Sequence, residues 1–205
     1  MRLLIIGAGG DAGSRIQAEA HRRGHDVTPA SRRPRVSSWM RIDAADPDRV
    51  EAACREHDVL IASTRPGAGR EGEVVDVARG LARGAGRAAT PLLVVGGASP
   101  LRIAGTAHSA LEDPRFVPEH IRPLARASTR QLEVLQEYPD TDWTYLAPAA
   151  HFAPGPRTAR YRITDGELVI GADGRSAISM EDFAVATLDL AESGTRAPRA
   201  VVGIG

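Results

Sequence analysis

Short apolar runs alternate with longer amphipathic segments along most of the chain. The clearest runs lie at residues 3–6, 58–62 and 91–95, and the first of them has no polar alternation, which indicates a strand covered on both faces. Further strands are predicted at residues 25–30, 40–42 and 143–146. Helices are predicted over residues 11–23, 46–56, 71–83, 118–138 and 180–192. Because strands and helices alternate, the order predicts an α/β fold with a parallel sheet covered by helices on both faces.

Turn and cap residues set several of the predicted boundaries. Gly24 ends the first helix, and Asp46 followed by Pro47 begins the second as N-cap and first helical residue. Pro123 is a point of interruption for the fourth helix. The segment 96–118 is rich in Gly, Ser, His and Pro, and we expect a loop of the length that often forms a functional lid.

The last third of the chain departs from regular alternation. Short strands are predicted at residues 168–170 and around Ile178, and residues 200–202 are predicted to form a final edge strand. A length of 205 residues with 42% apolar residues fits one folded domain. We therefore expect a single domain over residues 1–205, with a small substrate lobe mainly from residues 148–180.

Charge and residue usage exclude several classes of protein. Basic and acidic residues balance at 26 each, which argues against a general binder of nucleic acid or of an anionic membrane. The single cysteine, Cys54, excludes an internal disulfide and a cysteine-cluster metal site. All 26 basic residues are arginine, so no lysine is present for a Walker loop, a Schiff base or a Tyr-x-x-x-Lys pair. No apolar run approaches the roughly 20 residues of a membrane span, and the apolar start is too short for a secretion signal, so we expect a cytoplasmic protein.

A glycine-rich segment joins the first predicted strand to the first predicted helix. Gly7, Gly10 and Gly13 give the spacing G-x-x-G-x-x-G, with Asp11 and Ala12 between the last two glycines. Gly7 permits a tight turn, Gly10 lets the backbone approach a pyrophosphate, and Gly13 permits close packing of helix on strand. The free N–H groups and the dipole of the helix N-terminus favour an anion. The alternative is a glycine-rich turn without a ligand, but the strand–loop–helix context favours a dinucleotide in a Rossmann-type doubly wound sheet.

The residues after the second predicted strand favour NADP(H) over NAD(H). An NAD site usually carries a carboxylate there to bind the ribose hydroxyls, whereas this chain reads Ser31-Arg32-Arg33-Pro34-Arg35. Arginine suits a 2′-phosphate because its guanidinium forms paired, charge-assisted hydrogen bonds. A solvated basic loop is the alternative reading, and Asp11 weakens the case slightly because a carboxylate repels phosphate.

Six segments spread over nearly the whole chain carry a resemblance to a known family. They read Gly-Ala-Gly-Gly-Asp-Ala-Gly at 7–13, Arg-Gly-His-Asp-Val at 23–27, Val-Val-Gly-Gly-Ala at 94–98, Asp-Trp-Thr-Tyr-Leu-Ala-Pro-Ala at 142–149, Pro-Gly at 154–155 and Ile-Ser-Met-Glu-Asp-Phe-Ala at 178–184. These segments resemble the atypical short-chain dehydrogenase/reductases of the NmrA-like and NADH-flavin-reductase-like kind, and more distantly the flavin reductases of the biliverdin reductase B type. The resemblance implies a nicotinamide cofactor, in a group that includes both reductases and cofactor-sensing regulators.

Carried over by position, the resemblance implies contacts along the whole cofactor. Arg32, with Arg33 beside it, would meet the 2′-phosphate, and Asp43 and Ala44 would border the adenine. The remaining implied contacts are Ser63 and Thr64 on the ribose–pyrophosphate path, Gly96, Gly97, Ala98 and Ser99 near the nicotinamide, and Pro148 and Ala149 flanking it. His151 falls close to a histidine that the biliverdin-reductase-like relatives carry beside the substrate pocket.

Two positions depart from the family pattern. Asp11 stands where arginine is common, and Pro100 stands at the family serine position, with Ser99 one place earlier. The second departure argues against a serine-based proton role.

These observations together predict NADPH-dependent reduction of a small organic molecule or a flavin, with a small-molecule substrate and neither nucleic acid nor membrane as partner. Without a Tyr-Lys pair, we expect the proton to come from His151, Ser99, Tyr161 or water. The alternatives are a non-catalytic NADP(H) sensor and an isomerase or cyclase without net redox change. His21 and His25 have the spacing of helical metal ligands, but Gly24 intervenes, so no metal site is expected.

Overall fold

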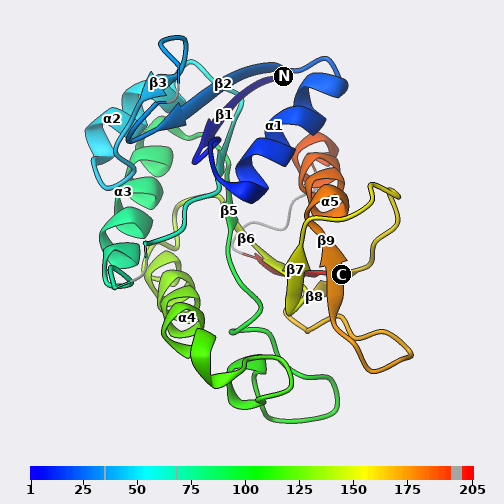
Figure 1. Cartoon of the computed structure of the whole chain (residues 1–205). Helices are drawn as coiled ribbons and strands as arrows, with labels where there is room; N and C mark the ends of the chain where they lie inside the picture. Colours follow the sequence, from blue (N-terminus) through cyan, green and yellow to red (C-terminus); the bar gives the residue numbers. More distant parts are fainter. Residues whose placement is uncertain (35, 68, 195–199) are drawn as a thin grey trace.

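The fold is built on one central sheet. The computed structural model describes residues 1–34, 36–67, 69–194 and 200–205. Over these residues the sheet has eight strands in the order β3-β2-β1-β4-β5-β6-β10-β8 (Figure 1). The strands are β1 (Arg2–Ile6), β2 (Asp26–Ser31), β3 (Met40–Arg41), β4 (Val59–Ala62), β5 (Leu92–Val95), β6 (Trp143–Pro148), β8 (Ile163–Asp165) and β10 (Ala200–Ile204). Neighbouring strands pair in parallel except β10 and β8, which are antiparallel. This is the strand order of a doubly wound Rossmann fold, extended at one edge by two strands.

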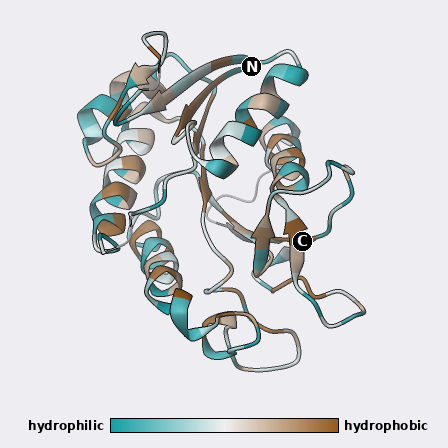
Figure 2. Ribbon diagram, viewed as in Figure 1, coloured by the Kyte–Doolittle hydropathy of each residue, from teal (hydrophilic) through white to brown (hydrophobic). Residues whose placement is uncertain are grey.

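Helices cover both faces of the sheet. On one face α1 (Asp11–Arg22) packs against α5 (Met180–Ser193), and on the other α2 (Pro47–Cys54), α3 (Glu73–Ala88) and α4 (Arg122–Gln136) lie side by side (Figure 1). Apolar residues concentrate on the inner strands (Figure 2), so an apolar core lies on each side of the sheet. Within the described residues, none of the helices has the length and apolarity that a bilayer span requires.

Four short elements lie outside these layers. Two 3-10 helices, η1 (Ala110–Glu112) and η2 (Glu119–Ile121), lie between β5 and α4. A small parallel sheet pairs β7 (His151–Ala153) with β9 (Ala177–Ser179). This small sheet lies within the segment expected to form the substrate side.

Most predicted boundaries are confirmed, together with the residues that set them. The Asp46 carboxylate accepts hydrogen bonds at 3.1 Å from the N–H groups of Asp48 and Arg49, with Pro47 as the first residue of α2. Gly24 follows α1 with a φ of 77°, a backbone conformation that favours glycine. Pro123 lies in the first turn of α4, after η2, so it begins this helix rather than interrupting it.

Helix α3 extends beyond its predicted end at residue 83. Its interior glycines Gly80 and Gly84 lie against α2 and the residues just before it. A Cβ atom on Gly80 would clash with the Ala44 carbonyl oxygen, and one on Gly84 would lie 2.6 Å from the Val50 side chain. The glycines therefore allow two helices to approach closely instead of ending one of them.

Two predictions about the last third of the chain are wrong, and one short strand was not predicted. Residues 168–170 form no strand; Leu168 and Val169 are buried, and the strand of this region is β8, whose residues are mostly exposed. Strand β7 was missed because three residues give no usable periodicity. Strand β10 is not at the edge, since β8 pairs on its outer side.

Candidate cofactor and substrate site

The carboxyl ends of β1, β4, β5 and β6 meet at one edge of the sheet, and two adjoining cavities lie there. The first has a volume of about 610 Å³ and the second about 450 Å³. Six residues line both cavities: Gly10, Ser63, Thr64, Arg65, Pro66 and Val74. The two cavities therefore adjoin along the edge where α/β sheets bind ligands.

The three glycines of the first loop have different environments. A Cβ atom on Gly7, whose φ is 88°, would clash with the Ser63 carbonyl oxygen, and one on Gly13 would clash with the Gly7 carbonyl oxygen. By contrast, a Cβ atom on Gly10 would meet only the Gly7 oxygen, at 3.4 Å, and Gly10 lines both cavities. Gly7 and Gly13 thus serve the fold. Gly10 keeps open a cradle at the N-terminus of α1 that fits a pyrophosphate.

The first cavity is strongly basic. Five arginines line it, with two carboxylates among them: Arg32, Arg33, Arg41, Arg65 and Arg70, with Asp43 and Glu73. The Arg32 guanidinium lies 3.2 Å from the Glu73 carboxylate, which also pairs with Arg70. Burial raises the pKa of Glu73, but hydrogen bonds and charges of Arg70 and Arg32 outweigh it and lower the pKa. The cavity therefore holds five arginines and only two carboxylates, an arrangement that fits a phosphorylated ligand.

The structure brings together nearly all the residues expected to bind the cofactor. Those that line one or both cavities are Gly7, Gly10, Asp11, Ala12, Arg32, Arg33, Asp43, Ala44, Ser63, Thr64, Gly96, Gly97, Ala98, Pro148 and Ala149. Gly13 lines neither, because it packs behind the loop against Gly7.

The second cavity is mainly apolar. Its outer wall comes from the end of the long loop, η2, α4, β7 and the start of α5, through Phe116, Val117, Ile121, Leu124, Phe152 and Met180. Ser99 also lines it, but the residue is buried. Its hydroxyl donates to the Ala125 carbonyl at 2.7 Å and accepts from the Thr129 hydroxyl at 3.2 Å. Ser99 therefore joins the long loop to α4 and has its proton already engaged.

His151 lies outside both cavities, contrary to its predicted position. Its backbone N–H donates to the Ser176 carbonyl at 2.8 Å in the small sheet, and its side chain is exposed. Successive strand residues point to opposite sides, and it is the next residue, Phe152, that lines the second cavity. The structure thus places an aromatic ring where the sequence suggested a histidine.

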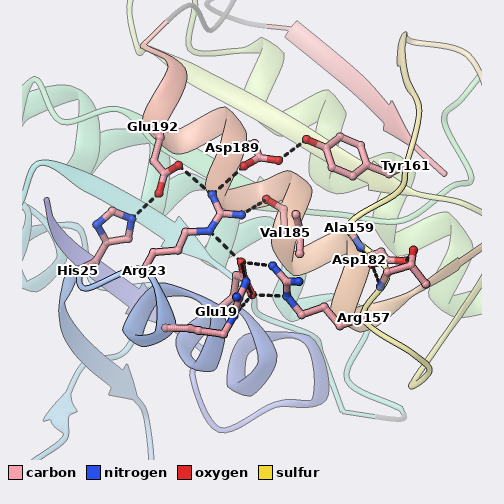
Figure 3. A network of polar contacts seen from close by, with 12 residues as sticks. Glu19, Arg23, His25, Arg157, Ala159, Tyr161, Asp182, Val185, Asp189 and Glu192 are labelled. Atoms are coloured by element: carbon pink, nitrogen blue, oxygen red, sulfur yellow. Dashed lines mark hydrogen bonds and ion pairs between the residues drawn. The ribbon is translucent and has the colours of Figure 1, made fainter.

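Tyr161 is likewise held away from the cavities. Its hydroxyl donates to Asp189 on α5, within the polar network between α1 and α5 (Figure 3). In the same network Arg23 binds Asp189 and Glu192, while Arg157 binds Glu19. Burial, the hydrogen bond to Asp189 and its charge raise the pKa of Tyr161 to about 12. Tyr161 therefore links the segment after β7 to α5 by a hydrogen bond and does not face the substrate side.

Several cavity residues were not predicted from the sequence. Tyr145 lies behind the lining of the second cavity and joins two residues that do line it, since its hydroxyl accepts from the Gly97 N–H and donates to the Ser128 carbonyl, each at 3.0 Å. Ser128 and Gln131 line the cavity from α4. The helical spacing of residues 121, 124, 128 and 131 was a usable signal, but it marks an inward face without showing that a cavity lies beside it.

Comparison with known proteins agrees with this geometry. Residues 7–193 match the NAD(P)H-binding family. The uncharacterised protein YwnB of Bacillus subtilis (strain 168) is 34% identical over 194 residues, which are 92% of this chain and 91% of YwnB. A solved structure from Streptococcus pneumoniae, provisionally named an NADH-flavin reductase, is 28% identical with a TM-score of 0.82, covering 100% of this chain and 98% of that one. Another, from Bacteroides thetaiotaomicron and provisionally named an epimerase, is 30% identical with a TM-score of 0.87, covering 100% and 96%. The chain therefore belongs to the NAD(P)H-binding family of NmrA-like, NADH-flavin-reductase-like Rossmann proteins.

Proposed function

We propose that this protein is an NADPH-dependent reductase of a flavin or another conjugated carbonyl compound. The observation that carries the proposal is that a basic cavity and an apolar cavity lie side by side and share six lining residues. The basic end fits the phosphates of the cofactor, and the apolar end is large enough for a small organic acceptor. The cofactor would supply a hydride, while the protein supplies binding and orientation.

The glycine loop and the loop after β5 would hold different parts of the cofactor. Gly10 and the N-terminus of α1 would bind the pyrophosphate. Gly96, Gly97 and Ala98, with Pro148 and Ala149 opposite, would flank the nicotinamide at the entrance of the second cavity.

Preference for NADP(H) is supported by the arginines of the first cavity. Arg32 is paired with Glu73, so a 2′-phosphate would replace the carboxylate as its partner. Charge-assisted hydrogen bonds of this kind correspond to about a 10- to 100-fold gain in affinity. We expect Arg32→Ala to weaken the binding of NADP+ by that factor and to leave the binding of NAD+ unchanged. Glu73→Gln should strengthen the binding of NADP+ selectively, because it removes the carboxylate that pairs with Arg32.

Calorimetric titration of both cofactors into the wild type and the two variants checks this preference. Equal affinity of the wild type for NADP+ and NAD+ would contradict it.

The lining of the second cavity restricts the acceptor. Among the described residues that line it there is no His, Tyr or Cys, and the only ionisable groups are Asp11 and Arg65. Because the Ser99 proton is already donated to Ala125, no lining side chain is a ready general acid at neutral pH. Reduction of a flavin or quinone gives a delocalised anion that can take its proton from water, whereas an isolated ketone needs a proton as the hydride arrives. The geometry therefore favours conjugated acceptors.

The test is the oxidation of NADPH, followed by its absorbance, with riboflavin, a naphthoquinone and an aliphatic ketone as acceptors. We expect turnover with the first two and little with the third. Turnover restricted to the aliphatic ketone would refute the assignment of water as proton source.

A second candidate, favoured by the epimerase-named neighbour from Bacteroides, is an isomerase without net redox change. It would consume its substrate while the NADPH absorbance stays constant. A cofactor sensor would bind NADPH tightly and turn over no acceptor.

A further inference from the structure

Gln131 has a largely buried side chain whose amide keeps access to a cavity. It lies on α4, is 4% exposed and lines the second cavity. Its side chain makes no hydrogen bond to any residue in the part of the chain that the structure describes. Buried polar groups are nearly always paired because an unpaired one costs stability. An unpaired amide facing a cavity is therefore explained most directly by a ligand that binds there.

The position of Gln131 along α4 indicates which end of the cavity it serves. Ile121 and Leu124, at the start of the helix, line the apolar outer end together with the long loop. Ser128 comes one turn later and lies against the loop after β5, since a Cβ atom on Gly97 would lie 2.7 Å from the Ser128 hydroxyl oxygen. Gln131 is one further turn away from the outer end on the same helix face. Its amide thus lies toward the inner end, one turn beyond Ser128, the residue that lies against Gly97.

The hydrogen-bonding chemistry of an amide restricts which chemical groups of a ligand can pair with it. Its NH2 donates and its carbonyl accepts, so full pairing needs a donor beside an acceptor. Phosphate oxygens can satisfy only the NH2. The nicotinamide riboside half of the cofactor carries a carboxamide and two ribose hydroxyls, each of which offers both. We infer that Gln131 is a cofactor-binding residue that pairs with these uncharged groups. This inference rests on the binding of a nicotinamide cofactor, and it holds whether or not the protein is a reductase.

The test compares Gln131→Leu with Gln136→Leu, a control on the same helix whose side chain is exposed. Each protein is titrated by calorimetry with NADP+ and with adenosine 2′,5′-bisphosphate, which lacks the nicotinamide riboside. We expect Gln131→Leu to weaken the binding of NADP+ by about 10- to 100-fold, which is the effect of one or two lost hydrogen bonds. Binding of the bisphosphate should stay unchanged, and the control should alter neither ligand.

Thermal unfolding without ligand separates binding from structure. Replacing an unpaired buried amide by leucine should leave the melting temperature equal or higher, whereas removal of a structural hydrogen bond would lower it. If the leucine variant does not fold, Gln131→Met serves as the second variant, because methionine adapts to irregular space.

Three results would overturn the inference: unchanged NADP+ affinity, an equal loss for both ligands, or a loss confined to the KM of the acceptor. None of the expected readouts depends on turnover. A protein that reduces no acceptor but shows the selective loss would refute the proposed function and still support Gln131 as a cofactor-binding residue.

Discussion

Glu19 is the structural centre of the polar network that joins α1 to α5 and to the segment after β7 (Figure 3). Its side chain is 4% exposed, and its carboxylate accepts from Arg22, Arg23 and Arg157 at 2.6, 2.8 and 2.9 Å. Burial by itself raises the pKa of Glu19, but the hydrogen bonds and charges of Arg157 and Arg23 outweigh it, so the pKa is lowered. We predict that Glu19→Gln destabilises the fold markedly.

The structure sets the expected magnitude. Removing one partner of a buried ion pair costs about 3–5 kcal/mol. The cost should be smaller here, because the Arg22 and Arg157 side chains are 52% and 37% exposed and can turn to water. Arg23 also keeps Asp189 and Glu192 as partners. We therefore expect a loss of about 2–3 kcal/mol in the free energy of unfolding. For a domain of this size, that loss lowers the melting temperature by about 4–12 °C.

The pH dependence gives an independent readout. Because the pKa of Glu19 is lower in the folded than in the unfolded protein, its carboxylate contributes stability above the unfolded value of about 4.3. That contribution is lost as the pH falls through the folded pKa. The difference between wild type and Glu19→Gln should therefore be full at pH 7 and shrink below about pH 4.

Calorimetric scans from neutral to acid pH test both expectations. Glu192→Gln is the matched control, because Glu192 lies in the same network but is 36% exposed. This variant should shift the melting temperature by no more than about 2 °C. A Glu19→Gln variant as stable as this control, or a difference that persists at low pH, would refute the reasoning.

Three further predictions follow from other contacts. Gly10→Val should fold, because a Cβ atom there makes only an ordinary contact, yet calorimetry should show a loss of at least about 100-fold in NADPH affinity. Gly13→Ala should instead destabilise the fold. Normal NADPH binding by Gly10→Val would contradict the assignment of the glycine loop to the cofactor. Tyr145→Phe leaves the Gly97 N–H and the Ser128 carbonyl without this partner, so the free energy of unfolding measured in urea should fall by about 1–3 kcal/mol. A fall below about 0.5 kcal/mol would count against a role of this hydroxyl in stability. Cys54 is buried, which raises its pKa to about 12, so iodoacetamide should label it only after unfolding, as mass spectrometry would show.

Local pattern was sufficient for the frame of this protein and for the glycine loop, whereas most of the other residues expected to bind the cofactor were implied by the family resemblance. Strands buried on both faces require continuous apolar runs, and such runs placed β1, β4 and β5 correctly. Helix starts depend on nearby residues, so Asp46 and Pro47 could be recognised as a cap. The glycine loop was predictable because its geometry is set within seven consecutive residues.

Tertiary structure alone decided which side chains face the cavities. His151 and Phe152 are neighbours in the sequence, and only the pairing of β7 with β9 determines which one lines the site. The contacts of Arg32 with Glu73 and of Tyr161 with Asp189 join segments far apart in the chain. The vacant hydrogen-bonding capacity of Gln131 appears only when α4 is packed beside the loop after β5. Side-chain direction and long-range pairing arise from the packed fold as a whole, and for that reason no local pattern encodes them.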